Sequence, residues 1–247
     1  MWSVEIIVLI FATFFIAGLI KGMVGLGLPI VVLVFLAVPI GVNSAIALML
    51  VPAIVTNLWQ AISGPSLKRL LVRLWSFLVS SVLGIWVAAK LASHVPPEAI
   101  LNFLGILLAL YSVFSLSRPQ IRPPGKYEHF LSPAVGGLSG VIYGTTGTFI
   151  IPGIVYLQAL GLKKNDLVQA LGITFVTISA TLMGSFLQRG IMDSNLALFS
   201  CAALLPTAVG IFAGQKLRHR VSESLFRTVF FWVLLFVGLY FAAAGQA

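Results

Sequence analysis

Apolar segments separated by short polar stretches recur along the whole chain, five in each half. Many of them approach the roughly 20 residues that an α-helix needs to cross a bilayer, but the second segment of each half is shorter. The pattern predicts an all-α integral membrane protein with about eight to ten transmembrane helices, in which the first two segments of each half form a bent or re-entrant pair. The predicted segments are residues 3–21, 26–39, 43–62, 70–92 and 98–116, then 130–144, 147–160, 166–188, 194–215 and 224–243.

Composition supports a membrane protein and excludes several other classes. Hydrophobic residues make up 60% of the chain and charged residues 9%, whereas soluble domains carry about 25% charged residues. The single cysteine, Cys201, excludes a disulfide framework or a thiol–metal cluster. The net charge of +9 comes from basic residues in short loops, so nucleic-acid binding is not expected. The first segment follows Glu5 rather than a basic region, and we interpret it as mature protein rather than a signal peptide.

The chain contains an internal repeat. The stretch "GIWVAAKLASHV" (Gly84–Val95) resembles "GIFAGQKLRHRV" (Gly210–Val221), which lies 126 positions later (210 − 84). The repeat predicts a first copy over residues 1–116, a polar linker over 117–129 and a second copy over 130–247. Other aligned pairs are Gly18 with Gly136, Gly22 with Gly140, Gly25 with Gly144 and Asn43 with Asn165.

The basic residues predict how the two copies lie in the membrane. They occupy every second loop, and cytoplasmic loops carry an excess of lysine and arginine. This places both termini on the extracytoplasmic side of the plasma (inner) membrane. Because each copy has five segments, the second copy enters from the opposite side, which is the inverted-topology architecture of many secondary transporters. The basic residues used are Lys68, Arg69, Arg73, Arg118, Arg122, Lys126, Lys163, Lys164, Lys216, Arg218 and Arg220.

Glycine-rich stretches interrupt both copies at corresponding places. They read "GMVGLGLPIVVL" (Gly22–Leu33) and "YGTTGTFIIPGIVYL" (Tyr143–Leu157). An interrupted membrane helix exposes backbone N–H groups, which can bind an anion at the positive end of a half-helix. Simple helix packing is the alternative, and we favour it for the GxxxG glycines Gly18, Gly22, Gly136 and Gly140. The predicted anion-binding residues are Gly25, Gly27, Gly144, Thr145, Thr146, Gly147 and Thr148.

Further polar residues lie within or beside apolar segments. Asn57 and Gln60 share a helix face, and they either join helices or line a substrate path. Gln169 could reach the same path, although helix capping and interhelical hydrogen bonding are favoured for it. Lys21 could attract an anion, and snorkelling to the membrane surface explains it equally well. For three further threonines, hydrogen bonding within their own helix is favoured: Thr174, Thr177 and Thr181.

The acidic residues and the missing motifs narrow the cargo. All six acidic residues map to loops or segment ends, so no carboxylate is placed to relay a proton or hold sodium within the membrane. The sequence contains no nucleotide-binding loop and no pattern of a nucleophile with its base. Neither a metal nor an organic cofactor is expected. These features favour a small anion as the transported species.

Three stretches resemble the TauE/SafE family of sulfite and organosulfur-anion transporters. They are "AGLIKGMVGLGLPIVVLVFL" (17–36), "GGLSGVIYGTTGTFIIPGIVYL" (136–157) and "LVQALGITFVT" (167–177). The resemblance covers nearly the whole chain, including its length and its duplication. It implies a plasma-membrane permease of about eight or more helices for sulfite, sulfonates or related small anions.

Together these observations predict a secondary or passive permease that works by alternating access. A membrane assembly or accessory subunit without transport is the alternative, and an enzyme is disfavoured. The expected partners are a sulfur oxyanion or sulfonate as substrate and the lipid bilayer, with a homodimer as the candidate assembly.

Overall fold

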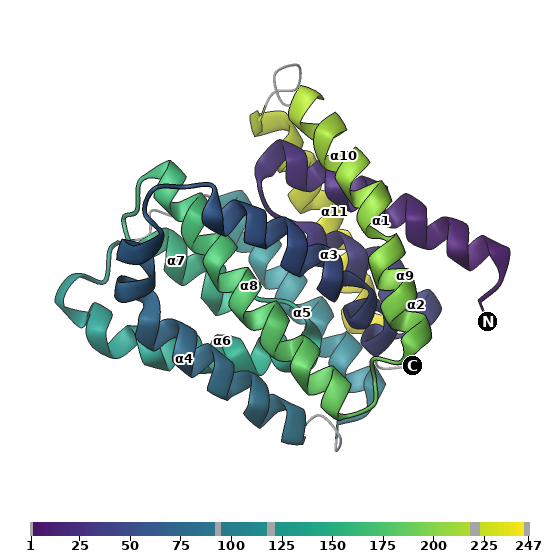
Figure 1. Cartoon of the computed structure of the whole chain (residues 1–247), viewed down its shortest axis with the longest axis horizontal. Coiled ribbons are helices and arrows are strands. Elements are labelled where there is room, and N and C mark those ends of the chain that lie inside the picture. The colour runs from purple at the N-terminus through teal and green to yellow at the C-terminus, as the bar shows by residue number, and fades with distance from the viewer. Residues whose placement is uncertain (1, 92–94, 118–121, 218–222, 245–247) are drawn as a thin grey trace.

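The computed structural model describes residues 2–91, 95–117, 122–217 and 223–244 (Figure 1). These residues form helices and connecting loops, with no strand among them. The helices are α1 (Val4–Val24), α2 (Leu28–Ile40), α3 (Val42–Ile62), α4 (Leu67–Leu91), α5 (Pro97–Ser117), η2 (Gly125–Tyr127), α6 (Glu128–Thr146), η3 (Ile150–Ile154), α7 (Val155–Ala159), α8 (Lys164–Gln188), α9 (Ser194–Ala202), α10 (Leu204–Leu217) and α11 (Glu223–Ala244).

The predicted segments all coincide with helices, and their ends agree within three residues. The segment predicted over 194–215 is divided at Ala203, which separates α9 from α10. Among the described residues, six stretches are long and apolar enough to cross a membrane: α1, α3, α4, α5, α8 and α9–α10 together. The prediction of an all-helical, multi-pass membrane protein is thereby confirmed.

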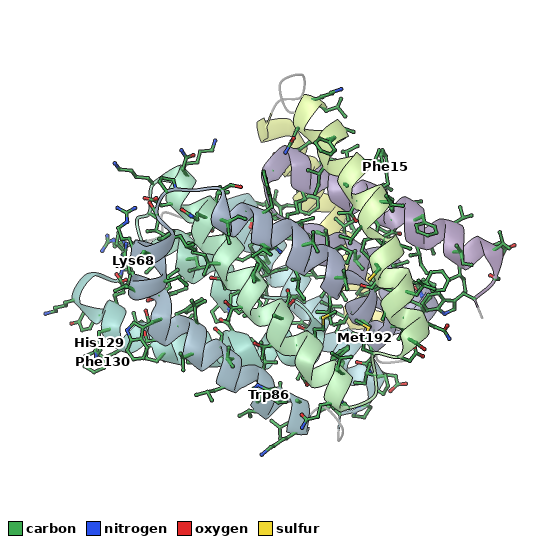
Figure 2. The ribbon with its side chains drawn as sticks, in the orientation of Figure 1. Phe15, Lys68, Trp86, His129, Phe130 and Met192 are labelled. Atoms are coloured by element: carbon green, nitrogen blue, oxygen red, sulfur yellow. The ribbon has the colours of Figure 1, made fainter. Side chains whose placement is uncertain are left out.

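The main helix contacts join the two halves of the chain. Helix α1 packs against α10, α4 against α6, α3 against α8, and α5 against α11. Helices α3 and α8 form the centre, with 56% and 61% of their apolar windows buried, against 22–44% in the other membrane-crossing stretches. Large apolar side chains on the outer helices, such as Phe15, Trp86 and Phe130, point away from the protein, as expected for a surface that faces lipid (Figure 2).

Glycines allow these helix pairs to pack closely, as the α1–α10 and α4–α6 pairs illustrate. A methyl group on Gly18 or Gly22 of α1 would overlap the backbone carbonyls of Thr207 and Ile211 in α10. In the other pair, Gly136 and Gly140 of α6 lie in the same way against Phe77 and Ser81 of α4. Small residues at such crossings let helix backbones approach within van der Waals contact. The packing interpretation of these four glycines is therefore confirmed.

The two chain ends lie on the same side of Figure 1, opposite the end that carries Lys68 and His129 in Figure 2. Three of the basic residues used in the topology prediction, Arg118, Arg218 and Arg220, lie outside the described residues.

Candidate functional site

Both glycine-rich stretches interrupt the helical backbone. Helix α1 ends at Gly25, which has a φ of +87° and donates its N–H to the Lys21 carbonyl at 2.7 Å. Helix α6 ends at Gly147, which has a φ of +71° and donates to the Tyr143 carbonyl at 2.9 Å. Side chains with a Cβ rarely adopt such φ values, so glycine suits both positions.

The structure corrects one aligned pair. The sequence comparison matched Gly25 with Gly144, but Gly25 and Gly147 hold the same place at the ends of their helices. Gly144 instead lies inside α6, where an added methyl group would contact Ile85 and Ala88 of α4. Gly144 is thus placed as a packing glycine one turn before the break.

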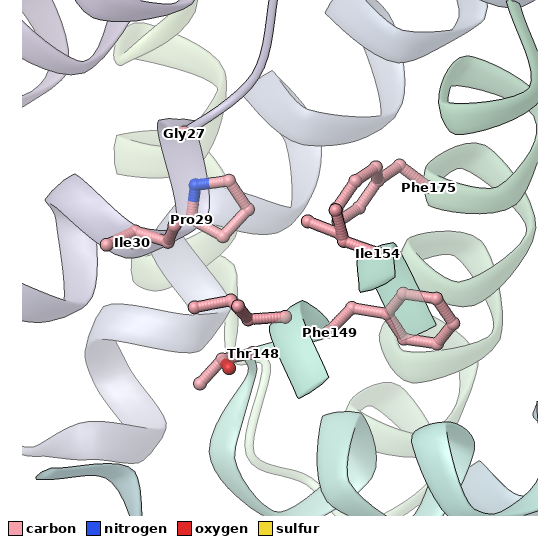
Figure 3. A pocket seen from close by; sticks show the side chains of 8 residues that line it. Gly27, Pro29, Ile30, Thr148, Phe149, Ile154 and Phe175 are labelled. Atoms are coloured by element: carbon pink, nitrogen blue, oxygen red, sulfur yellow. The ribbon is translucent and has the colours of Figure 1, made fainter. Parts of the chain in front are cut away.

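The two breaks share a small buried cavity (Figure 3). From the first break it is lined by Gly27, Pro29 and Ile30, which begin α2. The cavity has room for about one water molecule. Stretches far apart in the sequence therefore meet at one place, as the pairing of the two breaks predicts. The other lining residues are Thr148, Phe149, Ile150 and Ile154 from the second break and Phe175 from α8.

Thr148 carries the unsatisfied polar group of this cavity. Its side chain is 1% exposed, and its Oγ1 has no hydrogen-bond partner among the described residues. The two neighbouring threonines differ from it, because their hydroxyls donate within their own helix. Thr145 donates to the carbonyls of Val141 and Ile142 at 3.1 and 3.0 Å, and Thr146 donates to Ile142 at 2.8 Å. Of the three predicted hydroxyl donors, the structure leaves Thr148 available to a ligand.

The start of α2 supplies backbone donors on the opposite wall. Gly27, with a φ of +112°, precedes the helix, and no side chain caps the helix there. The first N–H groups of any helix lack intrahelical acceptors, and Pro29 has no N–H to satisfy. The N–H groups of Leu28 and Ile30 therefore lack an intrahelical partner. Together with the helix dipole, this end of α2 favours a negatively charged ligand.

Aromatic rings pack around Phe149 at the second break. Phe149 is 1% exposed, and its ring meets those of Phe77, Tyr143 and Phe175 edge-on at centroid distances of 5.9, 5.9 and 6.0 Å. Sequence reasoning did not select Phe149 or Phe175, because an aromatic residue in an apolar segment carries no signal of its own. These edge-to-face contacts fix Phe149, the residue next to Thr148, in the wall of the cavity.

Asn57 lies beside a buried lysine rather than in the cavity. Lys21 in α1 donates from Nζ to Asn57 Oδ1 at 2.6 Å and to Thr56 Oγ1 at 3.0 Å. Lys21 is 7% exposed and Asn57 is 4% exposed. The structure thus decides against a lysine that snorkels to the surface. Thr56, which sequence reasoning did not select, completes this cluster.

Gln60 and Gln169 join helices at one end of the bundle. Gln60 donates to the Val168 carbonyl at 2.7 Å. Gln169 donates to the carbonyls of Ala61 and Gly64 at 2.8 and 2.7 Å, and accepts from the Ser66 N–H at 3.0 Å. With its amide fully used, Gln169 takes the interhelical role that the sequence favoured. Thr177 and Thr181 likewise bond carbonyls of their own helix, whereas the buried Thr174 Oγ1 finds no partner in the part of the chain that the structure describes.

Two ion pairs close the same end of the bundle. Arg69 at the start of α4 pairs with Asp166 at the start of α8 at 2.6 Å. Arg73 holds both carboxylate oxygens of Glu128 at 2.7 and 2.8 Å, and it also donates to the Leu160 carbonyl. Each contact links the first half of the chain with the second. Exposed pairs of this kind contribute about 1 kcal/mol or less each.

A multi-pass helical protein whose interrupted helices meet at a buried cavity has the architecture of a membrane transporter. The chain matches the profile of the Sulfite exporter TauE/SafE family over residues 10–241, and it belongs to this family. It is accordingly a membrane transporter, not an enzyme, and the family implies sulfur anions as its substrates. Comparisons with curated proteins and with solved structures give no significant match.

Proposed function

We propose that the protein is a secondary or passive permease for sulfite, a sulfonate or a related organosulfur anion, and that the cavity between the two breaks binds this anion. The unpartnered Thr148 Oγ1, buried in a wall shared by both breaks, is the observation that carries the proposal. Its hydroxyl would donate to an anion oxygen, and the N–H groups at the start of α2 would donate from the other side. Glycine at position 27 would let the anion approach the backbone closely.

Transport would proceed by alternating access between two inverted repeats. The observed pairing supports this arrangement: the first segment of each half packs on the fourth of the other, the third on the third, and the fifth on the fifth. That pattern is what a two-fold relation between residues 1–116 and 130–247 would produce. The cavity is smaller than a sulfur oxyanion, so the structure corresponds to a closed state in this mechanism.

The polar contacts at one end of the bundle would form the gate on that side. These contacts tie α3 and α4 to α6 and α8, and they are made by Gln60, Gln169, Arg69 and Arg73. These contacts would separate when the cavity opens towards that end, which the basic loops assign to the cytoplasm.

Replacing Thr148 with valine tests the site. We expect Thr148→Val to weaken sulfite binding about 10- to 150-fold, because a charge-assisted hydrogen bond contributes about 1.5–3 kcal/mol. Binding is measured as thermal stabilisation of the purified protein, and transport as uptake into proteoliposomes. The panel contains sulfite, sulfate, thiosulfate, sulfoacetate, taurine, acetate and phosphate.

The matched control is Thr181→Val, whose hydroxyl bonds only the Thr177 carbonyl of its own helix. It should bind and transport like the wild type. Unchanged affinity in Thr148→Val would reject this cavity as the site. A wild-type protein that neither binds nor transports any anion of the panel would favour the accessory-subunit alternative instead.

Cysteine labelling tests the orientation. In a Cys201→Ser background, Lys126→Cys places one exposed thiol in η2, and Ser194→Cys places one at the start of α9. We expect a membrane-impermeant thiol reagent added to whole cells to label Ser194→Cys and not Lys126→Cys. Labelling of Lys126→Cys in intact cells would reverse the orientation and place both termini in the cytoplasm.

A further inference from the structure

We infer that Lys21, with Thr56 and Asn57, forms a second binding station for the transported anion, separate from the cavity between the breaks. The inference rests on the proposed function and names the positive charge that this function requires. A cationic side chain is otherwise costly at a buried position in a membrane helix, and such residues commonly mark ion and substrate pathways.

The described part of the chain gives the buried lysine no opposite charge. Its side chain is 7% exposed, and both of its hydrogen-bond partners, Asn57 and Thr56, are neutral. The ion pairs within the described residues use Arg69 with Asp166 and Arg73 with Glu128, so no described carboxylate pairs with Lys21. A buried charge is usually paired or bound to an ion of opposite sign.

One N–H donor of the ammonium group is also left without an acceptor among the described residues. An ammonium carries three N–H donors and no acceptor. Two are directed to Asn57 Oδ1 at 2.6 Å and Thr56 Oγ1 at 3.0 Å, and the described residues offer no acceptor to the third. An oxyanion supplies both things that are missing, an acceptor for this donor and a negative charge.

Helix α3 connects this station with the cavity. Near its start, Ile46 and Met49 lie against Gly147 of the second break. Asn57 follows Met49 by eight residues, which is about 12 Å along a helix. Beyond it, Gln60 bonds Val168 at the end closed by the ion pairs. An anion that moves along α3 from the cavity towards that end would therefore pass the Lys21 ammonium.

The competing explanation is that these hydrogen bonds only hold α1 and α3 together, as a structural contact. Asn57→Asp distinguishes this structural contact from a binding site. This change keeps the shape of the side chain but gives Lys21 a carboxylate partner. A structural contact would be as strong or stronger as an ion pair, so transport would be unchanged. A binding station would lose its free positive charge, and we expect sulfite affinity to fall about tenfold or more.

The test uses the full-length protein in proteoliposomes, with sulfite as the probe and thermal stabilisation as the second readout. Asn57→Asp and Lys21→Met should both lose affinity, and Lys21→Arg should retain more of it than Lys21→Met. Asn57→Asp should melt no lower than the wild type, which separates lost binding from lost folding. The control is Lys164→Met at the exposed start of α8, which removes a positive charge away from the cluster.

The outcomes distinguish the two proposals. If the wild type binds sulfite and Asn57→Asp binds it equally well, the station is rejected, while the cavity between the breaks is unaffected. If the wild type binds no sulfur anion at all, the proposed function fails and the station fails with it. A loss of affinity as large in Lys164→Met as in Lys21→Met would reduce the effect to net charge and overturn the inference.

Discussion

Gly140→Ala is expected to lower the unfolding free energy by about 2–4 kcal/mol. The added methyl group would overlap the backbone carbonyl of Ser81, which belongs to α4 and has no freedom to rotate away. Helices α4 and α6 would have to separate, although alanine has the better intrinsic helix propensity. Because Thr148 follows directly after the end of α6, sulfite binding should weaken as well. Thermal unfolding of the detergent-purified protein measures the loss of stability.

The same substitution in α8 is the control. Gly184 has no atom within 4 Å of an added Cβ, so Gly184→Ala should be neutral or stabilise by up to about 1 kcal/mol. Equal melting temperatures for Gly140→Ala and Gly184→Ala would show that the close crossing of α4 and α6 does not limit stability.

Gln169→Leu is expected to cost about 3–5 kcal/mol of unfolding free energy. The side chain is 2% exposed, and its amide satisfies two carbonyls and one N–H of the α3–α4 connection. Leucine would leave these three groups without their partner, the Ala61 carbonyl at a buried site and the other two at part-buried sites. The α3 and α4 ends would also lose a main attachment to α8. The measurement is again thermal unfolding, with expression level as a second readout.

Gln60→Leu is the matched control, because Gln60 is partly exposed and makes a single bond to Val168. We expect it to cost no more than about 1 kcal/mol.

The contact with Gly64 offers a second check, since an added methyl group there would overlap the Gln169 amide. Gly64→Ala should therefore be harmful in the wild type and milder in Gln169→Ala, in a double-mutant cycle. Additive effects of the two changes would contradict this fit.

The helices and their ends could be predicted from the sequence because their causes are local. The bilayer requires apolar segments of a certain length, and glycine or proline ends them. The GxxxG spacing of Gly18 with Gly22 also predicted close packing, since small residues on one face of a membrane helix typically lie where another helix crosses it. The paired breaks could be recognised because each combines glycine with a following proline.

The site itself could be predicted only in part. Sequence reasoning grouped Thr145, Thr146 and Thr148, which share a composition and a neighbourhood. Which hydroxyl remains available depends on where α6 ends, because a threonine inside a helix bonds the carbonyl three or four residues before it. Thr148 lies beyond the last turn of α6, so its hydroxyl does not make this local hydrogen bond.

The sequence by itself thus determined the class of protein, the helical segments, the two breaks and the glycines that bring helices together. The tertiary structure alone decided that the breaks share one cavity, that Gln169 holds the α3–α4 connection, and that Lys21 turns inward to Asn57. The physical reason is the distance along the chain over which each effect acts. Hydropathy and helix breaking act between neighbours along the chain, whereas the partner of a buried polar group is set by helices that are distant in sequence and adjacent in space.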